Sequence, residues 1–164
     1  MRLLRRYNEA GGGPASLLVM VLVLTLGACG DPVSNFELQG VGTLDCPMFQ
    51  ATVNAILDQD IGGRTCSAAG CHLIGQSAGG AFKIYANAQP NSPQMQYNYL
   101  ASKGFANLTD PPQSKLLLEP LLGAQSIVGS HAGGDIFAST SDPNYQTILA
   151  WITNQIQGSS SCFP

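Results

Sequence analysis

The segment Cys66-Ser67-Ala68-Ala69-Gly70-Cys71-His72 constrains the fold of this chain more than any other feature. It sets two thiols and an imidazole close together, directly after a short helical pattern and before a glycine-rich stretch. Such a cluster either closes a local disulfide or holds a metal ion or prosthetic group. The rest of the chain must therefore fold around that loop or around whatever the loop binds.

The N-terminus has the pattern of an export signal. Arg2, Arg5 and Arg6 precede an uncharged apolar tract over residues 17–26. A membrane-spanning helix needs about 20 apolar residues, whereas the core of a signal peptide needs only about 7 to 15. We therefore predict a signal peptide.

The tract ends in Leu26-Gly27-Ala28-Cys29, which resembles the lipobox of bacterial lipoproteins. The resemblance implies cleavage before Cys29 and attachment of diacylglycerol to its sulfur. An ordinary signal peptide that ends near a cysteine is the alternative. We expect a signal peptide over 1–28, a lipid-anchored tether over 29–45 and one domain over 46–164. The protein would be exported and anchored to the cell envelope, at the periplasmic face or the outer membrane.

Charge excludes one class of partner. Removing residues 1–28 from the 164 leaves 136 residues with 4 basic and 9 acidic side chains, a net charge of −5. Nucleic-acid binding needs clustered basic side chains that displace counterions. We therefore expect no nucleic-acid partner.

The cysteines divide into three groups. Cys29 would carry lipid, and Cys46 and Cys162 flank the first and last predicted helices, where a disulfide would join the ends of the domain. Cys66 and Cys71 form a local pair, and a disulfide between them is a competing possibility. The sequence alone does not set the connectivity.

Hydrophobic spacing predicts a mainly α protein with few helices and long loops. Asp142-Pro143 supplies an N-cap and a first-turn proline for the last helix. Helices would cover about 40 of the 136 residues, and long loops without structure of their own usually wrap something. The predicted helices are 48–58, 94–103, 111–118 and 144–156, and 82–85 could form a short strand.

A cysteine pair followed directly by histidine is how c-type haem is attached, although the usual spacing has two intervening residues and this chain has four. With its context, the chain resembles a single-haem bacterial cytochrome c domain over about residues 46–157. The residues that carry the resemblance are Ile56-Leu57, Gly79-Gly80-Ala81-Phe82, Ser114-Lys115-Leu116-Leu117, His131-Ala132-Gly133-Gly134 and the closing Tyr145-Gln146-Thr147-Ile148-Leu149-Ala150-Trp151-Ile152.

The resemblance implies a cytochrome c-like fold wrapped around one covalent haem c. Cys66 and Cys71 would bind the haem, and His72 would be the proximal iron ligand. We expect His131 as the distal ligand, since it is the one other histidine after residue 28 and lies among glycines. Met95, Met48 and an open sixth position remain alternatives.

The expected function is electron transfer with unidentified redox partner proteins, by a monomer held at the membrane through its lipid. The protein would then be an electron carrier and not an enzyme. A haem enzyme or gas sensor would need His131 away from the iron. The remaining alternative is a non-haem envelope lipoprotein that acts as a binding or structural module, with a Cys66–Cys71 disulfide or, as a variant, a zinc site.

A few other side chains have two interpretations. We expect core packing for Trp151 and Tyr145. Tyr97 and Tyr99 could line a haem edge or pack locally. Arg64 and Lys83 could neutralise haem propionates.

Overall fold

The structure is a computed structural model that describes residues 42–123 and 131–164. The expected signal peptide and the predicted lipidation site Cys29 lie outside the described residues, as does most of the expected tether. Thr43 and Leu44 are buried, so packing against the domain begins within the last residues of the expected tether.

The first helical stretch contains a π-helical turn. It runs through α1 (Cys46–Met48), the π-helix η1 (Phe49–Val53) and α2 (Asn54–Asp58). The Asn54 amide donates to the Phe49 carbonyl, five residues back, which is the π pattern. The helix predicted over 48–58 is therefore present, and it begins two residues early.

The middle of the chain holds the second predicted helix and a divided third. Helix α3 (Pro93–Gly104) begins at Ser92, whose hydroxyl accepts from the Met95 amide at 3.1 Å. The expectation of one helix over 111–118 is wrong. The chain instead forms a 3₁₀ turn, η2 (Pro111–Gln113), and a short helix, α4 (Lys115–Leu118).

Ser114 explains the break between η2 and α4. Its backbone is extended, with φ −68° and ψ 130°, and its side chain is fully buried. The hydroxyl donates to the Pro111 carbonyl at 2.6 Å and accepts from the Asn107 amide at 2.9 Å. Local side-chain bonds of this kind compete with helix continuation.

The last helix, α5 (Pro143–Thr153), has the predicted N-cap. The Asp142 carboxylate accepts from the amides of Asn144 at 2.8 Å and Tyr145 at 3.4 Å. The helix ends three residues before the predicted Ile156. Ile156 is not on the helix face but pairs with Thr43, with both backbone bonds at 2.8 Å.

The short strand considered for 82–85 does not form. Ile84 makes only an isolated parallel bridge to Leu73. Across residues 42–123 and 131–164 the structure has isolated bridges and no named strand. The described part is therefore mainly helical, as the sequence predicts.

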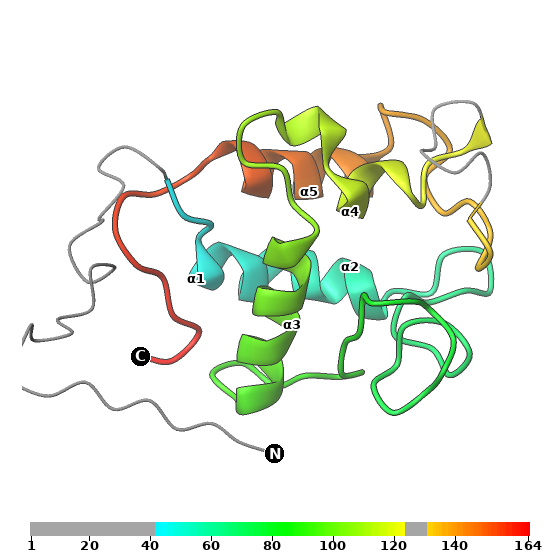
Figure 1. The fold of residues 1–164 in the computed structure, drawn as a ribbon, viewed down its shortest axis with the longest axis horizontal. Coiled ribbons are helices and arrows are strands. Elements are labelled where there is room, and N and C mark those ends of the chain that lie inside the picture. The colour runs from blue at the N-terminus through cyan, green and yellow to red at the C-terminus, as the bar shows by residue number, and fades with distance from the viewer. Residues whose placement is uncertain (1–41, 124–130) are drawn as a thin grey trace, which may run out of the picture. The chain divides into compact units, whose positions relative to one another are not determined.

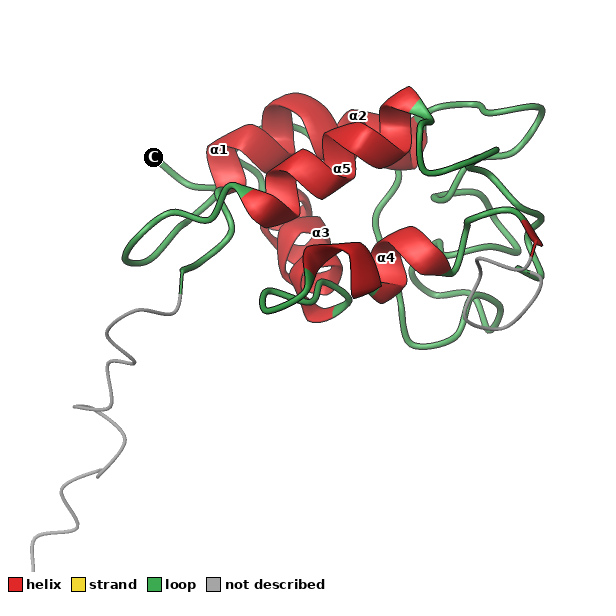
Figure 2. Ribbon diagram, turned by 90° about the horizontal axis from the view of Figure 1, so that it is seen from above, coloured by secondary structure: helices red, strands yellow, loops and turns green. Residues whose placement is uncertain are grey.

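The core lies where the first helical stretch packs against α3 and α5 (Figures 1 and 2). The Phe49 ring centroid lies 5.2 Å from that of Trp151 and 5.8 Å from that of Tyr99. The indole N–H of Trp151 donates to the Asp45 carbonyl at 2.8 Å, and the Tyr99 hydroxyl donates to the Leu44 carbonyl at 2.6 Å. The core expectation for Trp151 is confirmed, and Tyr145 is also buried.

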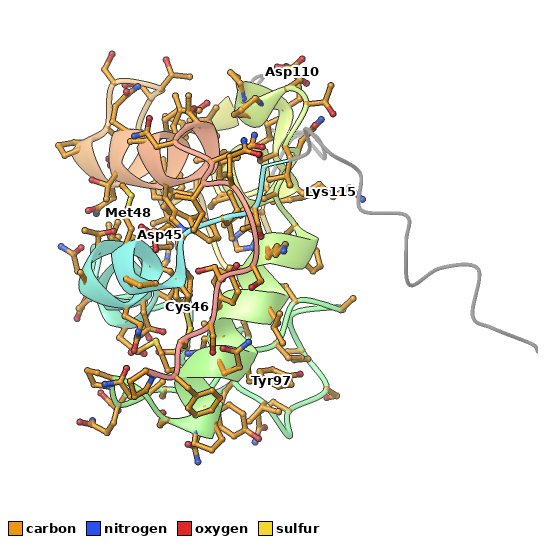
Figure 3. The ribbon with its side chains drawn as sticks, turned by 90° about the vertical axis from the view of Figure 1, so that its left-hand side faces the viewer. Asp45, Cys46, Met48, Tyr97, Asp110 and Lys115 are labelled. Carbon is orange, nitrogen blue, oxygen red and sulfur yellow. A yellow bond between two sulfur atoms is a disulfide. The ribbon has the colours of Figure 1, made fainter. Side chains whose placement is uncertain are left out.

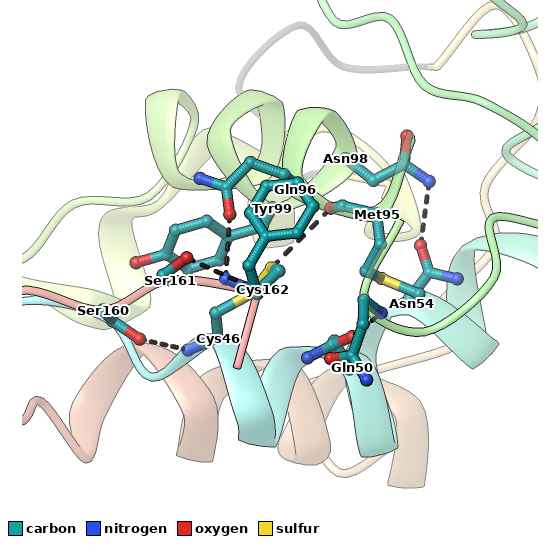
Figure 4. The surroundings of a disulfide bond; sticks show 12 residues. Cys46, Gln50, Asn54, Met95, Gln96, Asn98, Tyr99, Ser160, Ser161 and Cys162 are labelled. Atoms are coloured by element: carbon teal, nitrogen blue, oxygen red, sulfur yellow. Dashed lines mark hydrogen bonds between the residues drawn. A yellow bond between two sulfur atoms is a disulfide. The ribbon is translucent and has the colours of Figure 1, made fainter. Parts of the chain in front are cut away.

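A disulfide joins Cys46 and Cys162, with their Cα atoms 5.1 Å apart (Figures 3 and 4). The Cys46 amide donates to the Ser160 hydroxyl at 2.7 Å, and the Cys162 amide donates to the Gln96 side-chain carbonyl at 2.8 Å. The C-terminal segment is thereby tied to both α1 and α3. In Figure 1, α1 lies on one side of the domain and the loops that follow α2 lie on the other.

Candidate functional site

A cavity of about 430 Å³ lies among the loops. Its volume is within the range of about 300 to 1,000 Å³ that is usual for small-molecule sites. The end of α2, the loop after it, α4, the segment from residue 131 and α5 all contribute walls. The lining residues that matter below are Leu57, Cys66, His72, Phe82, Leu116, Lys115, Glu119, His131 and Phe137.

The loop from Cys66 to His72 closes on itself beside the cavity. The Ser67 amide donates to the Leu57 carbonyl at 3.1 Å, which fixes the loop to the end of α2, and the His72 amide donates to the Cys66 carbonyl at 3.0 Å. Ala69 and Gly70 are exposed, and Gly70 has a φ of +85°. The two residues beyond the usual spacing are therefore accommodated by an outward turn, which leaves the ends of the loop together.

His72 is held in one orientation by backbone carbonyls. Its Nδ1 lies 2.9 Å from the Gly79 carbonyl oxygen and 3.0 Å from that of Phe82. Since both partners are acceptors, Nδ1 carries the proton and Nε2 keeps its lone pair. Burial lowers the pKa of His72, against the two carbonyls that raise it, and nearby His131 and Lys83 lower it further.

Gly79 is required by this arrangement. Its φ is +80°, and a β-carbon there would overlap the Cys71 carbonyl and the Nδ1 atom of His72. No other residue type fits this position without displacing the loop.

His131 presents the same tautomer. Its Nδ1 donates to the Gly134 carbonyl at 3.0 Å, so Nε2 again keeps the lone pair. The His72 and His131 ring centroids are 5.8 Å apart, and the ring planes are within 18° of parallel. The structure thus brings together two imidazoles that are 59 positions apart in the chain.

The two cysteines of the loop are free thiols in the structure. Cys66 lines the cavity. Burial, then the neighbouring Cys71, raises the pKa of the Cys66 thiol to about 11. Cys71 lies beside the His131 turn, since its Sγ is 3.8 Å from the place of a β-carbon on Gly133.

The other residues singled out from the sequence lie elsewhere. Met95 is buried beside the disulfide (Figure 4), and neither Met95 nor Met48 lines the cavity. Tyr99 belongs to the core, whereas Tyr97 is 41% exposed and packs edge-on against Tyr85. None of these four candidates contacts the cavity.

The two basic candidates are engaged in the loops. The Lys83 ammonium donates to the carbonyls of Gln76, at 2.8 Å, and Ala78. The Arg64 guanidinium lies against Gly134. Neither lines the cavity, so the interpretation of Arg64 and Lys83 as partners of propionates has no contact to support it.

Sequence reasoning missed Lys115 and Glu119, which line the cavity. Lys115 begins α4 and Glu119 directly follows the helix, so their spacing of four residues places both on one face. It also missed the three carbonyls that orient the histidines, since a carbonyl leaves no mark in the sequence.

No protein-family model, curated protein or solved structure matches this chain. No group of three or more His, Cys, Asp or Glu side chains among the described residues is arranged to hold a metal ion alone. No helix in the part that the structure describes is long and apolar enough to cross a membrane.

Proposed function

We propose that this protein is an exported, lipid-anchored electron carrier with a cytochrome c-like fold and one covalent haem c. The observation that carries the proposal is the pair of nearly parallel imidazoles at the cavity, each with Nδ1 bound to a carbonyl and Nε2 available. An imidazole nitrogen lies about 2 Å from a bound metal ion, so rings on opposite sides of one ion have centroids roughly 6 Å apart. The observed 5.8 Å fits that requirement.

The residues at the cavity also suit the covalent attachment of a haem and its shielding from water. Two free thiols flank the outward-turned loop, and thioether formation adds each S–H across a vinyl group with no oxidant. Bound haem would supply one-electron chemistry through Fe(III) and Fe(II). Apolar walls such as Leu57, Leu116 and Phe137 exclude water from the ring.

Each residue then has one role. Cys66 and Cys71 would hold the group covalently, and His72 and His131 would supply the two imidazole ligands of the iron. The Gly79, Phe82 and Gly134 carbonyls keep both Nδ1–H groups occupied, which strengthens the imidazoles as ligands. If both histidines held the iron, no position would be left for a substrate, and the protein would act as an electron carrier and not as an enzyme.

The lipid on Cys29 would hold the carrier near membrane-bound redox partners and raise their effective concentration. Two histidine ligands would give a lower reduction potential than histidine with methionine. The helical packing described above, with the first and last helices together and the cavity against the loops, is the arrangement expected of a cytochrome c-like monomer.

The deciding experiment is expression of the exported chain with a cytochrome c maturation system, followed by a denaturing gel stained for haem peroxidase activity. We expect staining in the wild type and none in Cys66→Ala/Cys71→Ala. A low-spin spectrum should become high-spin in His131→Ala. Met95→Leu is the matched control for the rival ligand, and it should leave the spectrum unchanged.

Other outcomes would select the alternatives. A high-spin wild-type spectrum would favour a haem enzyme or gas sensor with an open sixth position. A folded protein without stain, with Cys66 and Cys71 in a disulfide, would leave an envelope lipoprotein with a binding or structural role.

A further inference from the structure

Two loops beside the cavity come into contact at Gly133 and Gly134. A β-carbon on Gly133 would lie 3.1 Å from His131 Cε1 and 3.8 Å from the Cys71 sulfur. A β-carbon on Gly134 would overlap the Arg64 guanidinium, and the Gly134 φ of +88° also favours glycine. Gly134 therefore makes room for the Arg64 side chain of the other loop, whereas the tight neighbour of Gly133 is His131 of the same turn.

The turn that carries His131 is held by its own short bonds. The Gly134 amide donates to the His131 carbonyl at 2.7 Å, and the Gly134 carbonyl accepts from His131 Nδ1 at 3.0 Å. The His131 amide lies 3.4 Å from the Asp135 carboxylate. Gly134 is thus hydrogen-bonded to both the backbone and the imidazole of His131.

Arg64 comes from the other loop. It precedes Cys66 by two residues, and its carbonyl accepts from the Ile61 amide at 2.8 Å. It is the one arginine of the chain after residue 28. A guanidinium is a rigid planar group, unlike the compact ammonium of a lysine.

We propose that Arg64 is a positioning residue for His131. By resting on Gly134, the guanidinium holds the Gly134 carbonyl under Nδ1 and so keeps Nε2 of His131 directed across the cavity toward His72. This inference rests on the proposed function, because the consequence of the position is occupancy of the sixth iron site. Loss of Arg64 releases the turn and opens that site to external ligands.

The first test uses the haem-loaded protein. Arg64→Ala should bind added imidazole about tenfold more tightly than the wild type and show a partly high-spin spectrum, because orienting partners of a ligand change metal affinity by about 10- to 100-fold. Arg64→Lys should restore only part of the wild-type behaviour. His131→Ala is the positive control.

Lys103→Ala is the matched control for loss of one positive charge. Its ammonium donates to the Thr43 hydroxyl at 2.8 Å, and Lys103 does not line the cavity. It should leave imidazole affinity unchanged. Equal imidazole affinity and spin state in Arg64→Ala and wild type would overturn the positioning role and leave the proposed function intact.

The second test needs no haem. In the full-length apoprotein, Arg64→Ala should speed amide hydrogen exchange at Gly134 about tenfold, with the amides of α5 unchanged. Unchanged exchange at Gly134 would contradict the inference even if the wild type proved to carry no haem. Failure of haem staining together with faster exchange would instead reject the proposed function and keep the Arg64 contact.

Discussion

The two ends of this domain are stabilised by different means. At one end, α1, η1, α3 and α5 bury Phe49, Tyr99 and Trp151 against one another and close with a disulfide. At the other, loops held by backbone hydrogen bonds and positive-φ glycines surround a cavity. The apolar core is continuous between the two ends, since Phe82 and Phe137 belong to it and also line the cavity. The helical end is filled by its own side chains, whereas the loop end leaves a cavity of about 430 Å³.

Trp151→Ala should have the largest effect. The side chain is fully buried and its N–H donates to the Asp45 carbonyl, so its loss leaves a large void and removes one of the two hydrogen bonds to that carbonyl, the other coming from the Phe49 amide. We expect the free energy of unfolding to fall by about 4 kcal/mol, measured by urea denaturation. Leu100→Ala, on an exposed position of α3, should change it little. A small effect of Trp151→Ala would mean that the helical end is not the stabilising part.

Removal of the disulfide should come next. Cys46→Ala/Cys162→Ala frees the two ends of a 116-residue separation, and the free energy of unfolding should fall by about 3 kcal/mol. Haem staining should persist in this variant at low temperature, because neither cysteine lines the cavity. Loss of staining with helical content intact would show that the two ends are not independent.

The alkylation rate of the Cys66 thiol tests how well the loop end is shielded from solvent. Its pKa is raised to about 11 from the usual 9.0, so the native apoprotein holds less thiolate at pH 8 than the unfolded chain does. Alkylation of Cys66 should be roughly 100-fold slower in the native state than in denaturant, since each pKa unit is tenfold in thiolate. The rate should rise with pH up to about 11. Peptide-resolved mass spectrometry measures it, and equal rates in both states would mean that the cavity wall is open.

Asn98 joins the two ends and should give the smallest effect. Its side chain accepts from the Tyr85 amide at 2.7 Å and donates to the Tyr85 carbonyl at 2.9 Å and the Asn54 side chain at 2.8 Å. Asn98→Leu leaves those groups unpaired and should cost about 2 kcal/mol in the free energy of unfolding. Gln94→Ala, exposed on the same helix, is the control. Faster amide exchange at Tyr85 without faster exchange in α5 would show that Asn98 mainly secures the loops.

The helical end could be predicted well from the sequence because its signals are local. Apolar spacing marks the helices, Asp142 and Pro143 mark the start of α5, and the flanking positions of Cys46 and Cys162 suggested their pairing. The errors have physical causes that spacing does not carry. Ser114 uses its hydroxyl to end η2, and Ile156 pairs with Thr43 from a distant part of the chain.

The loop end could be predicted only in its chemical groups. Cys66, His72 and His131 stood out by residue type, and the structure brings His72 and His131 together. Their orientation comes from carbonyls of Gly79, Phe82 and Gly134, which every residue possesses and no sequence pattern reports. Lys115 was visible as a charge, but its place at the cavity depends on how α4 packs.

The position of the Cys46–Cys162 disulfide has a mechanical consequence. Tension on the chain before Gly42 would be met first by the two Thr43–Ile156 backbone bonds and then by the covalent link at Cys46. Helix α1, which contains Cys46, lies on the side of the domain opposite the loops that follow α2 (Figure 1). Pulling on the chain ahead of residue 42 would therefore load this hydrogen-bonded and cross-linked region, while the segment that carries His72 and the turn that carries His131 stay outside the line of force.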